Sequence, residues 1–249
     1  MSWTSANGNK NGNGHTSGRK ASRNAWLITY ADMVTVLLTF FVMIFIYMKE
    51  AENSIDRWIN HLLNQTYTEL THYVNENSIE GIEVDRVTKG IRIILSSGVV
   101  FAPGFADLKS NALPVLSEVG ALINNSTLVH IEENPEYAEI FRNLRKQGRD
   151  LKVDIRVEGH TDSDPYYGRE FESNWELSAA RALAVVKYMT ASTGLEEQKF
   201  SALGYGEYRP IVPNTSESNK QRNRRVEIYL DANLVATNGV STRTADRLN

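Results

Sequence analysis

The chain has 249 residues, 27 of them basic and 30 acidic, and 41% are hydrophobic, which allows one globular domain, a membrane segment and connecting stretches. This nearly balanced charge gives no reason to expect a nucleic-acid partner. Because the chain contains no cysteine, disulfides, thiolate metal sites and cysteine nucleophiles are excluded.

Residues 1–24 are rich in Gly, Asn and Ser and lack apolar periodicity, which predicts a disordered tail. An apolar stretch follows over 25–48, and about 20 such residues suffice to cross a bilayer as a helix. Only basic charges precede this span, and acidic residues such as Glu50 and Glu52 come soon after it. The positive-inside rule therefore predicts a cytoplasmic N-terminus and an exported remainder, and the span is expected to be an uncleaved anchor.

Asp32 is the single charged residue of the span. An ionised Asp near a helix centre costs about 2.5–3.5 kcal/mol on insertion scales, so an intramembrane carboxylate indicates a function. Thr35 and Thr39 share its helical face, at i+3 and i+7. The alternative is a protonated carboxyl, or one bonded to a neighbouring helix. Since one helix cannot enclose a pore, an ion path along this face requires other subunits.

Residues 49–75 are predicted to form a periplasmic amphipathic helix. Its apolar positions include Ile55, Trp58, Ile59 and Leu62, which recur at helical spacing. Two interpretations remain open: a helix that lies on the membrane and blocks a channel as a plug, or a dimerising helix that continues the span.

Beyond a short polar linker, the pattern changes to alternating strands and helices, which predicts an α/β (α+β) sandwich with helices on one side of a sheet. This domain is expected over 82–231, and the tail 232–249 is expected to be disordered. The expected strands are 82–87, 90–95, 151–158, 199–204 and 226–231, and the expected helices are 111–123, 135–146 and 174–191.

Asp162 follows a predicted strand and Arg181 lies on the next helix. Together they could bind a ligand that carries both an amine and a carboxylate, because Arg presents a planar fork to carboxylates and Asp accepts from ammonium groups. The alternative is an internal salt bridge between the two. A second basic cluster, with Arg224 and Arg225, precedes the last strand.

His160 lies close to Asp162 and Ser163, but the chain has no G-x-S-x-G motif, and its other histidines are not at ligand spacing. We therefore expect no catalytic residue, no bound metal and no cofactor; the chain is not expected to be an enzyme.

Two parts of the chain resemble a known family. The span, over 26–41, resembles the MotB/PomB subunit of the bacterial flagellar stator, and the domain resembles the OmpA-like peptidoglycan-binding module. The resemblance covers about 24–231, and the matching segments of the domain are 101–109 (FAPGFADLK), 157–162 (VEGHTD), 174–182 (NWELSAARA), 204–210 (GYGEYRP) and 223–227 (NRRVE).

The resemblance implies that Asp32 carries the ion, with Thr35, Thr39 and Tyr30 nearby. Tyr30 is more similar to proton-driven members than to sodium-driven ones, but H⁺ and Na⁺ both remain open as the transported ion. The implied partners are MotA-like membrane subunits that surround a homodimer of this chain, and the lipid of the inner membrane. The implied function is a rotary motor driven by ion flow.

The resemblance also implies that Asp162 and Arg181 bind diaminopimelate in peptidoglycan. Thr161 and Asn174 belong to the same candidate site, and Arg224 and Arg225 are expected to line or support it. The helix at 49–75 falls where such proteins carry the plug.

Two features depart from the family pattern: the linker is short, and 125–148 is extra sequence of unassigned role. The alternatives to a flagellar stator are the motor subunit of a Zorya-type phage-defence system and a passive peptidoglycan tether.

Overall fold

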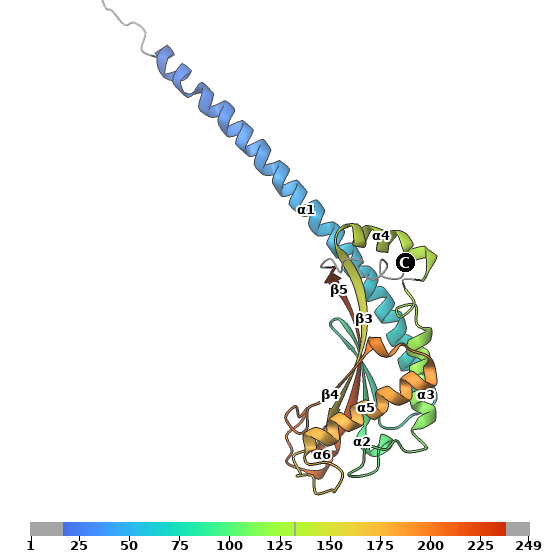
Figure 1. Cartoon of the computed structure of the whole chain (residues 1–249). Coiled ribbons are helices and arrows are strands. Elements are labelled where there is room, and N and C mark those ends of the chain that lie inside the picture. Colours follow the sequence, from blue (N-terminus) through green and yellow to red (C-terminus); the bar gives the residue numbers. More distant parts are fainter. Residues whose placement is uncertain (1–16, 132, 238–249) are drawn as a thin grey trace, which may run out of the picture. The chain divides into compact units, whose positions relative to one another are not determined.

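The computed structural model describes residues 17–131 and 133–237 (Figure 1). They form two compact units that meet between Asp56 and Arg57, and each unit is described by itself. Helix α1, Ser17–Glu76, runs through the first unit and into the second. The predicted span is thus confirmed as helical, but the predicted tail is wrong over 17–24, where Ala, Arg and Lys favour helix. Residues 1–16 lie outside the described residues.

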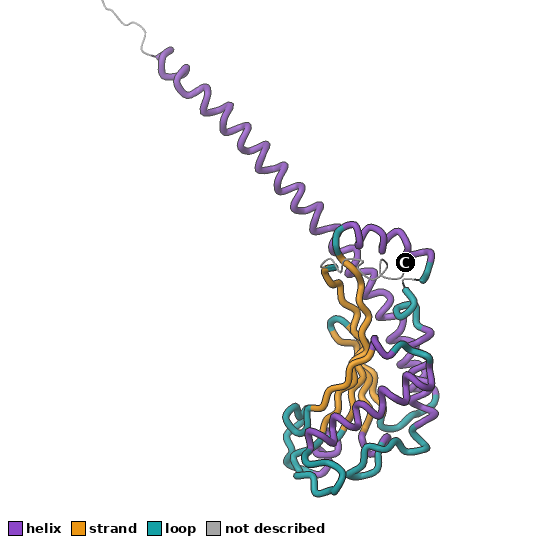
Figure 2. The backbone as a smooth tube through the Cα atoms, viewed as in Figure 1, coloured by secondary structure: helices purple, strands orange, loops and turns teal. Residues whose placement is uncertain are grey.

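The second unit is built on a five-stranded sheet in the order β1-β2-β5-β3-β4 (Figure 2). Only β3 and β4 pair in parallel; the other neighbours are antiparallel. The strands are β1 Ile82–Val87, β2 Gly90–Ser96, β3 Arg149–His160, β4 Phe200–Gly204 and β5 Arg225–Ala236.

Strands β1 and β2 form a hairpin. Val87 pairs with Gly90, so the connection is the two residues Thr88 and Lys89. Gly90 also lies close to the next strand, because a Cβ there would come within 2.4 Å of the carbonyl oxygen of Leu230. A side chain at this position would separate β2 from β5.

The core lies between the sheet and the helices on one of its faces, as predicted. Helix α5, Asn174–Thr193, packs on β3 and β4, and helix α3, Leu113–Asn125, packs on α5 (Figure 1). The inward residues of β3 alternate with polar ones, and they are Leu151, Val153, Ile155 and Val157. This period of two is the one that predicted the strand. Gly194, with φ of 74°, ends α5 in the left-handed conformation that favours glycine.

The end of α1 packs on the extra segment 125–148. Within this segment, a 3₁₀ helix, Pro135–Tyr137, leads into α4, Ala138–Lys146. The Trp58 ring lies 4.9 Å from the Tyr137 ring and 6.2 Å from the Phe141 ring, between centroids. Ile59 and Leu62 are buried as well. In the part of α1 predicted to be amphipathic, Trp58 is therefore covered by the same chain, a contact that neither the plug nor the dimer interpretation includes.

Two strands are longer than predicted, since β3 and β5 pair along their whole length, from Arg149 with Ala236 to His160 with Arg225. The expected disorder after 231 is therefore wrong up to Ala236; 238–249 lie outside the described residues. Two short helices were not predicted, α2 Ser97–Val100 and α6 Glu217–Asn223, because four and seven residues are too few to show a helical period.

Candidate functional site

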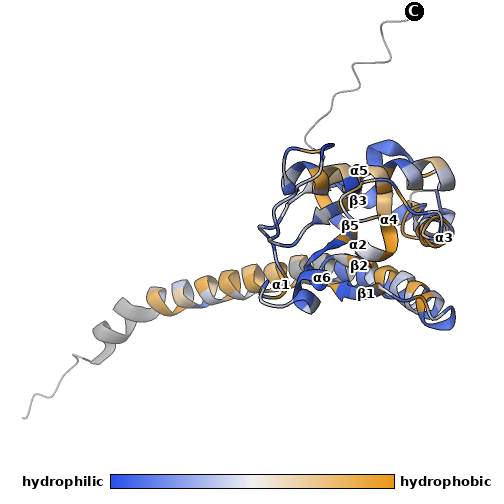
Figure 3. Ribbon diagram, turned by 90° about the horizontal axis from the view of Figure 1, so that it is seen from below, coloured by the Kyte–Doolittle hydropathy of each residue, from blue (hydrophilic) through white to orange (hydrophobic). Residues whose placement is uncertain are grey.

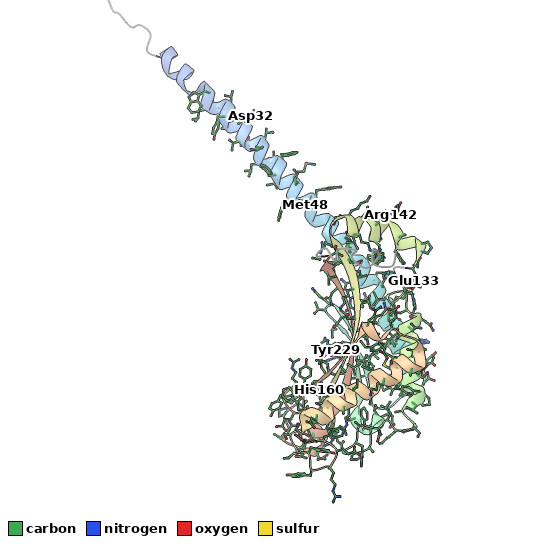
Figure 4. The ribbon with its side chains drawn as sticks, viewed as in Figure 1. Asp32, Met48, Glu133, Arg142, His160 and Tyr229 are labelled. Atoms are coloured by element: carbon green, nitrogen blue, oxygen red, sulfur yellow. The ribbon has the colours of Figure 1, made fainter. Side chains whose placement is uncertain are left out.

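In the first unit, Trp26–Met48 form 23 residues of helix, long and apolar enough to cross a membrane (Figure 3). Asp32 lies on this helix (Figure 4). Its carboxylate has no hydrogen-bond or ion-pair partner among the described residues, whereas the hydroxyls of Thr35 and Thr39 donate to the carbonyls of Asp32 and Val36, at 2.8 Å each. The hydroxyls of both threonines are hydrogen-bonded within the helix. The Asp32 carboxylate is therefore the polar group of this face that remains available for another interaction.

Tyr30 does not share that face. It precedes Asp32 by two residues, which is about 200° around a helix, and its ring lies 6.4 Å from that of Trp26. The helix therefore brings together Asp32, Thr35 and Thr39, but not Tyr30.

In the second unit, a pocket of about 1000 Å³ opens where β3 ends. Its walls are the segment after α2, the segment after β3, the first two turns of α5, and α6. The pocket is lined by five of the six predicted binding residues: Thr161, Asp162, Asn174, Arg181 and Arg224.

Arg181 is a buried cation without a carboxylate partner among the described residues. It is 5% exposed. It donates to the carbonyls of Phe105, at 2.9 Å, and Ala102, at 3.4 Å, and to the hydroxyl of Ser97, at 3.1 Å. Burial lowers the pKa of Arg181 to about 10, helped by the charge of Arg224 and opposed by that of Asp162. The guanidinium is still charged at neutral pH, and its environment favours binding of an anion.

The Asp162 carboxylate forms an ion pair with Arg224, so the alternative of an internal salt bridge between Asp162 and Arg181 does not agree with the structure. Asp162 also accepts the backbone N–H of Asp164, at 3.0 Å. Arg224 bridges to Glu217, at 2.6 Å. Burial lowers the pKa of Arg224, but hydrogen bonds to Glu217 and Asp162 outweigh it and raise the pKa. In the pocket, the negative charge of Asp162 is thus shared with Arg224. The positive charge of Arg181 has no carboxylate partner among the described residues.

A sequence profile of the OmpA family matches residues 100–224, half of the chain, and a profile described as membrane MotB of the proton-channel complex MotA/MotB matches residues 9–62. The chain belongs to the OmpA family and is a MotB-type stator B subunit.

Relatives and solved structures agree with this assignment. Motility protein B of Bacillus subtilis is 28% identical over 83% of this chain and 90% of its own length. An uncharacterized protein of the same organism, YtxE, is 27% identical over 89% and 93%. The crystal structure of a putative MotB-like protein from Desulfovibrio vulgaris is 31% identical and covers 71% of this chain and 95% of its own, with a TM-score of 0.55.

In this MotB-type chain, Arg225 does not line the pocket. Arg225 is the first residue of β5; its buried side chain pairs with Glu227, at 2.6 Å, on the far side of β5 from the core. It also donates to the carbonyl of Arg209, at 3.2 Å. Its role is to hold neighbouring segments together, so only the supporting part of the expectation agrees with the structure.

Sequence reasoning missed the aromatic part of the pocket. Phe101 and Phe105 line it, as does Tyr166, whose hydroxyl donates to the carbonyl of Gly104, at 3.1 Å. Phe101 also lies under the Arg181 guanidinium, 5.2 Å from ring centroid to Cζ. The matched segment 101–109 contained this signal, but it had no assigned role.

A buried cluster lies on the face of the sheet away from the core. One ligand atom each of Glu158, His160 and Glu227 lie within 4.8 Å of one another. Neither ring nitrogen of His160 has a hydrogen-bond partner among the described residues, and its Nε2 lies 3.7 Å from the Glu158 carboxylate. The carboxylates are already engaged, since Glu158 pairs with Arg156 and Glu227 accepts from Arg225 and from the Tyr229 hydroxyl, at 2.5 Å. Arginines compensate their charge, and we assign no metal to this cluster.

Proposed function

We propose that this chain is the ion-conducting, peptidoglycan-anchored B subunit of a rotary motor, in the inner membrane, with its C-terminal domain in the periplasm. The observation that carries the proposal is the presence, on one chain, of an apolar helix with an unpartnered Asp32 and a domain whose pocket holds the uncompensated Arg181. The proposed partners are MotA-like subunits and a second copy of this chain.

In the proposed anchor, the pocket binds the stem peptide of peptidoglycan. Diaminopimelate carries an ammonium and a carboxylate at one end. Its carboxylate suits the Arg181 guanidinium, which has only neutral acceptors, and its ammonium suits the free lone pairs of Asp162. Asn174 and Thr161 border the same space.

In the proposed motor, H⁺ or Na⁺ binds Asp32 from the periplasm and leaves to the cytoplasm. Neutralising a desolvated carboxylate changes its interaction with the surrounding helices, which can bias a ring of subunits between rotational positions. One elementary charge that crosses 100 mV supplies about 2.3 kcal/mol, so two carboxylates in a dimer can sustain stepping. The ring does work only if the B subunits are held by the wall.

The decisive variant is Asp32→Asn, with Asp56→Asn, the next acidic side chain described, as its matched control. Motor output and binding to peptidoglycan sacculi are measured in both. A motor predicts that Asp32→Asn abolishes output and leaves sacculus binding intact, while Asp56→Asn retains both. Full output with Asp32→Asn would show a passive tether.

Flagellar and phage-defence outputs share this design, and similarity to motility protein B along 90% of that protein favours the flagellar one. Swimming of cells that lack this gene separates them, since a defence motor leaves swimming unchanged. The same assay without sodium identifies the coupling ion.

A further inference from the structure

Two large aromatic side chains, Trp175 and Tyr208, stand exposed side by side near the pocket. They are 52% and 68% exposed. Their ring centroids are 5.2 Å apart, with the ring planes at 45°. Exposed apolar residues are common singly, but two touching aromatics present a continuous apolar surface that favours a ligand. We call this pair the aromatic platform.

The aromatic platform is held rigidly. Trp175 lies in the first turn of α5, and Tyr208 lies two residues after Gly206, which has φ of +53°. The Gly206 N–H donates to the Ser178 hydroxyl, and its carbonyl accepts from the Thr161 N–H, at 2.9 Å each. Both rings are therefore fixed on the same frame as the pocket, and less entropy is lost when a ligand binds.

The aromatic platform directly adjoins the pocket. Asn174, which lines the pocket, immediately precedes Trp175. Its side-chain amide donates to the Asp164 carbonyl, at 2.8 Å, and to the Glu207 carboxylate, at 3.4 Å, so it joins the pocket wall to the segment that carries Tyr208. A ligand that extends from the pocket past Asn174 meets the two rings.

We propose that the aromatic platform binds the glycan strand from which the stem peptide in the pocket branches. This inference rests on the proposed function and adds a carbohydrate subsite to it. A pyranose ring presents a face of C–H groups, whose positive polarisation suits the negative face of an aromatic ring. Glu207 and the exposed Arg209 flank Tyr208 and offer an acceptor and a donor fork to hydroxyl and acetamido groups.

The test compares three soluble ligands by calorimetry with the full-length chain in detergent: a disaccharide that carries its stem peptide, the same stem peptide released from the sugar, and glycan oligomers without peptide. The variants are Trp175→Ala, Trp175→Phe and Leu183→Ala, a control on the same helix with a side chain that is 45% exposed. Both changed side chains, Trp175 and Leu183, are exposed in the wild-type protein, so each of the three variants is expected to fold.

Trp175→Ala is expected to weaken the disaccharide–peptide about three- to tenfold, the range of one aromatic contact. Binding of the free stem peptide should not change. Trp175→Phe should restore most of the loss, and Leu183→Ala should have no effect. Equal affinity of wild-type protein for the disaccharide–peptide and the free peptide, or equal weakening of both by Trp175→Ala, would overturn the inference.

A change of oligomeric state in Trp175→Ala, measured by sedimentation, would also overturn it, by identifying a second copy of the chain as the occupant. Failure of the proposed function looks different: the wild-type chain would then bind no peptide-containing ligand at all.

Discussion

The Arg224 guanidinium, and not that of Arg181, forms the ion pair with the Asp162 carboxylate. Asp162 is 5% exposed, so its charge needs this partner in the free protein. Arg181 is left with neutral acceptors. One arginine of the pocket is thus paired with a buried carboxylate, whereas the other has no carboxylate partner among the described residues.

This division of roles predicts the result of a double-mutant cycle. Arg224→Gln should lower the free energy of unfolding by about 1–3 kcal/mol, because a buried carboxylate loses its charged donor. In a protein that already carries Asp162→Asn, Arg224→Gln should lower the free energy of unfolding by clearly less. In the corresponding cycle of Arg181→Gln with Asp162→Asn, the coupling free energy should be smaller. The free energy of unfolding of each variant is measured by chemical denaturation of the full chain. Equal coupling in the two cycles would contradict the assignment.

The contact between α1 and the extra segment makes Trp58 a second test. Trp58→Ala removes the ring that packs on Tyr137 and Phe141, and it should lower the free energy of unfolding by about 2–4 kcal/mol. Trp175→Ala is the matched control, and it should change stability by less than about 0.5 kcal/mol, as expected for an exposed position. Hydrogen exchange should also become faster in 57–76 of the Trp58 variant; unchanged exchange there would mean that the contact does not hold α1.

The lowered pKa of Glu227 predicts that the folded protein loses stability in acid. Burial raises its pKa, but hydrogen bonds from Tyr229 and Arg225 and the Arg225 charge outweigh burial, so the pKa lies below 4.5. A carboxyl with a lowered pKa stabilises the fold above its unfolded-state pKa, and the contribution is lost as pH falls through the folded-state value. Stability should therefore decrease below about pH 4.5.

The measurement is the free energy of unfolding at several pH values between about 3 and 6. Glu227→Gln should be less stable at neutral pH, because Arg225 loses its partner, and its stability should depend less on pH over this range. A pH dependence equal to that of the wild type would assign the acid sensitivity to other carboxyls.

Gly159 tests the packing that positions the pocket. A Cβ there would come within 2.0 Å of the Ser178 carbonyl oxygen, so Gly159→Ala must push α5 away from β3. We expect a loss of about 1–3 kcal/mol in stability, together with weaker ligand binding. Gly98→Ala is the control for stability alone, since the nearest atom to its Cβ would be 4.0 Å away, although Gly98 itself lines the pocket. Comparable losses in the two variants would show that the close approach is unimportant.

The elements that the sequence predicted correctly have a strong local period. The alternation in Leu151–Glu158 and the capped helix from Asn174 are properties of neighbouring residues, so they can be read without the fold. The placing of Asp162 and Arg181 in one pocket followed from a strand end and the helix that comes after it, whereas Thr161 and Asn174 were expected there from the resemblance to the OmpA-like module.

Other features depend on contacts between distant segments. The pair of Asp162 with Arg224 spans 62 residues, and no spacing rule chooses Arg224 over Arg181. The spacing of Trp58 and its apolar neighbours predicted an amphipathic helix with an exposed face. Only the folded structure shows that segment 125–148 covers the Trp58 ring. Arg225 was grouped with Arg224 because they are adjacent, although Arg224 ends α6 and Arg225 begins β5.

The long pairing of β3 with β5 has a mechanical consequence. The pocket lies at the His160 end of β3, and α4, which contacts Trp58, leads into its other end at Arg149. Twelve residues of strand span about 40 Å. Tension between these two ends runs parallel to the strands, whereas the hydrogen bonds of the antiparallel ladder lie across them. All hydrogen bonds between β3 and β5 therefore carry the load together in shear, and they do not open one after another. The sheet is thus oriented to resist a pull from the cell wall.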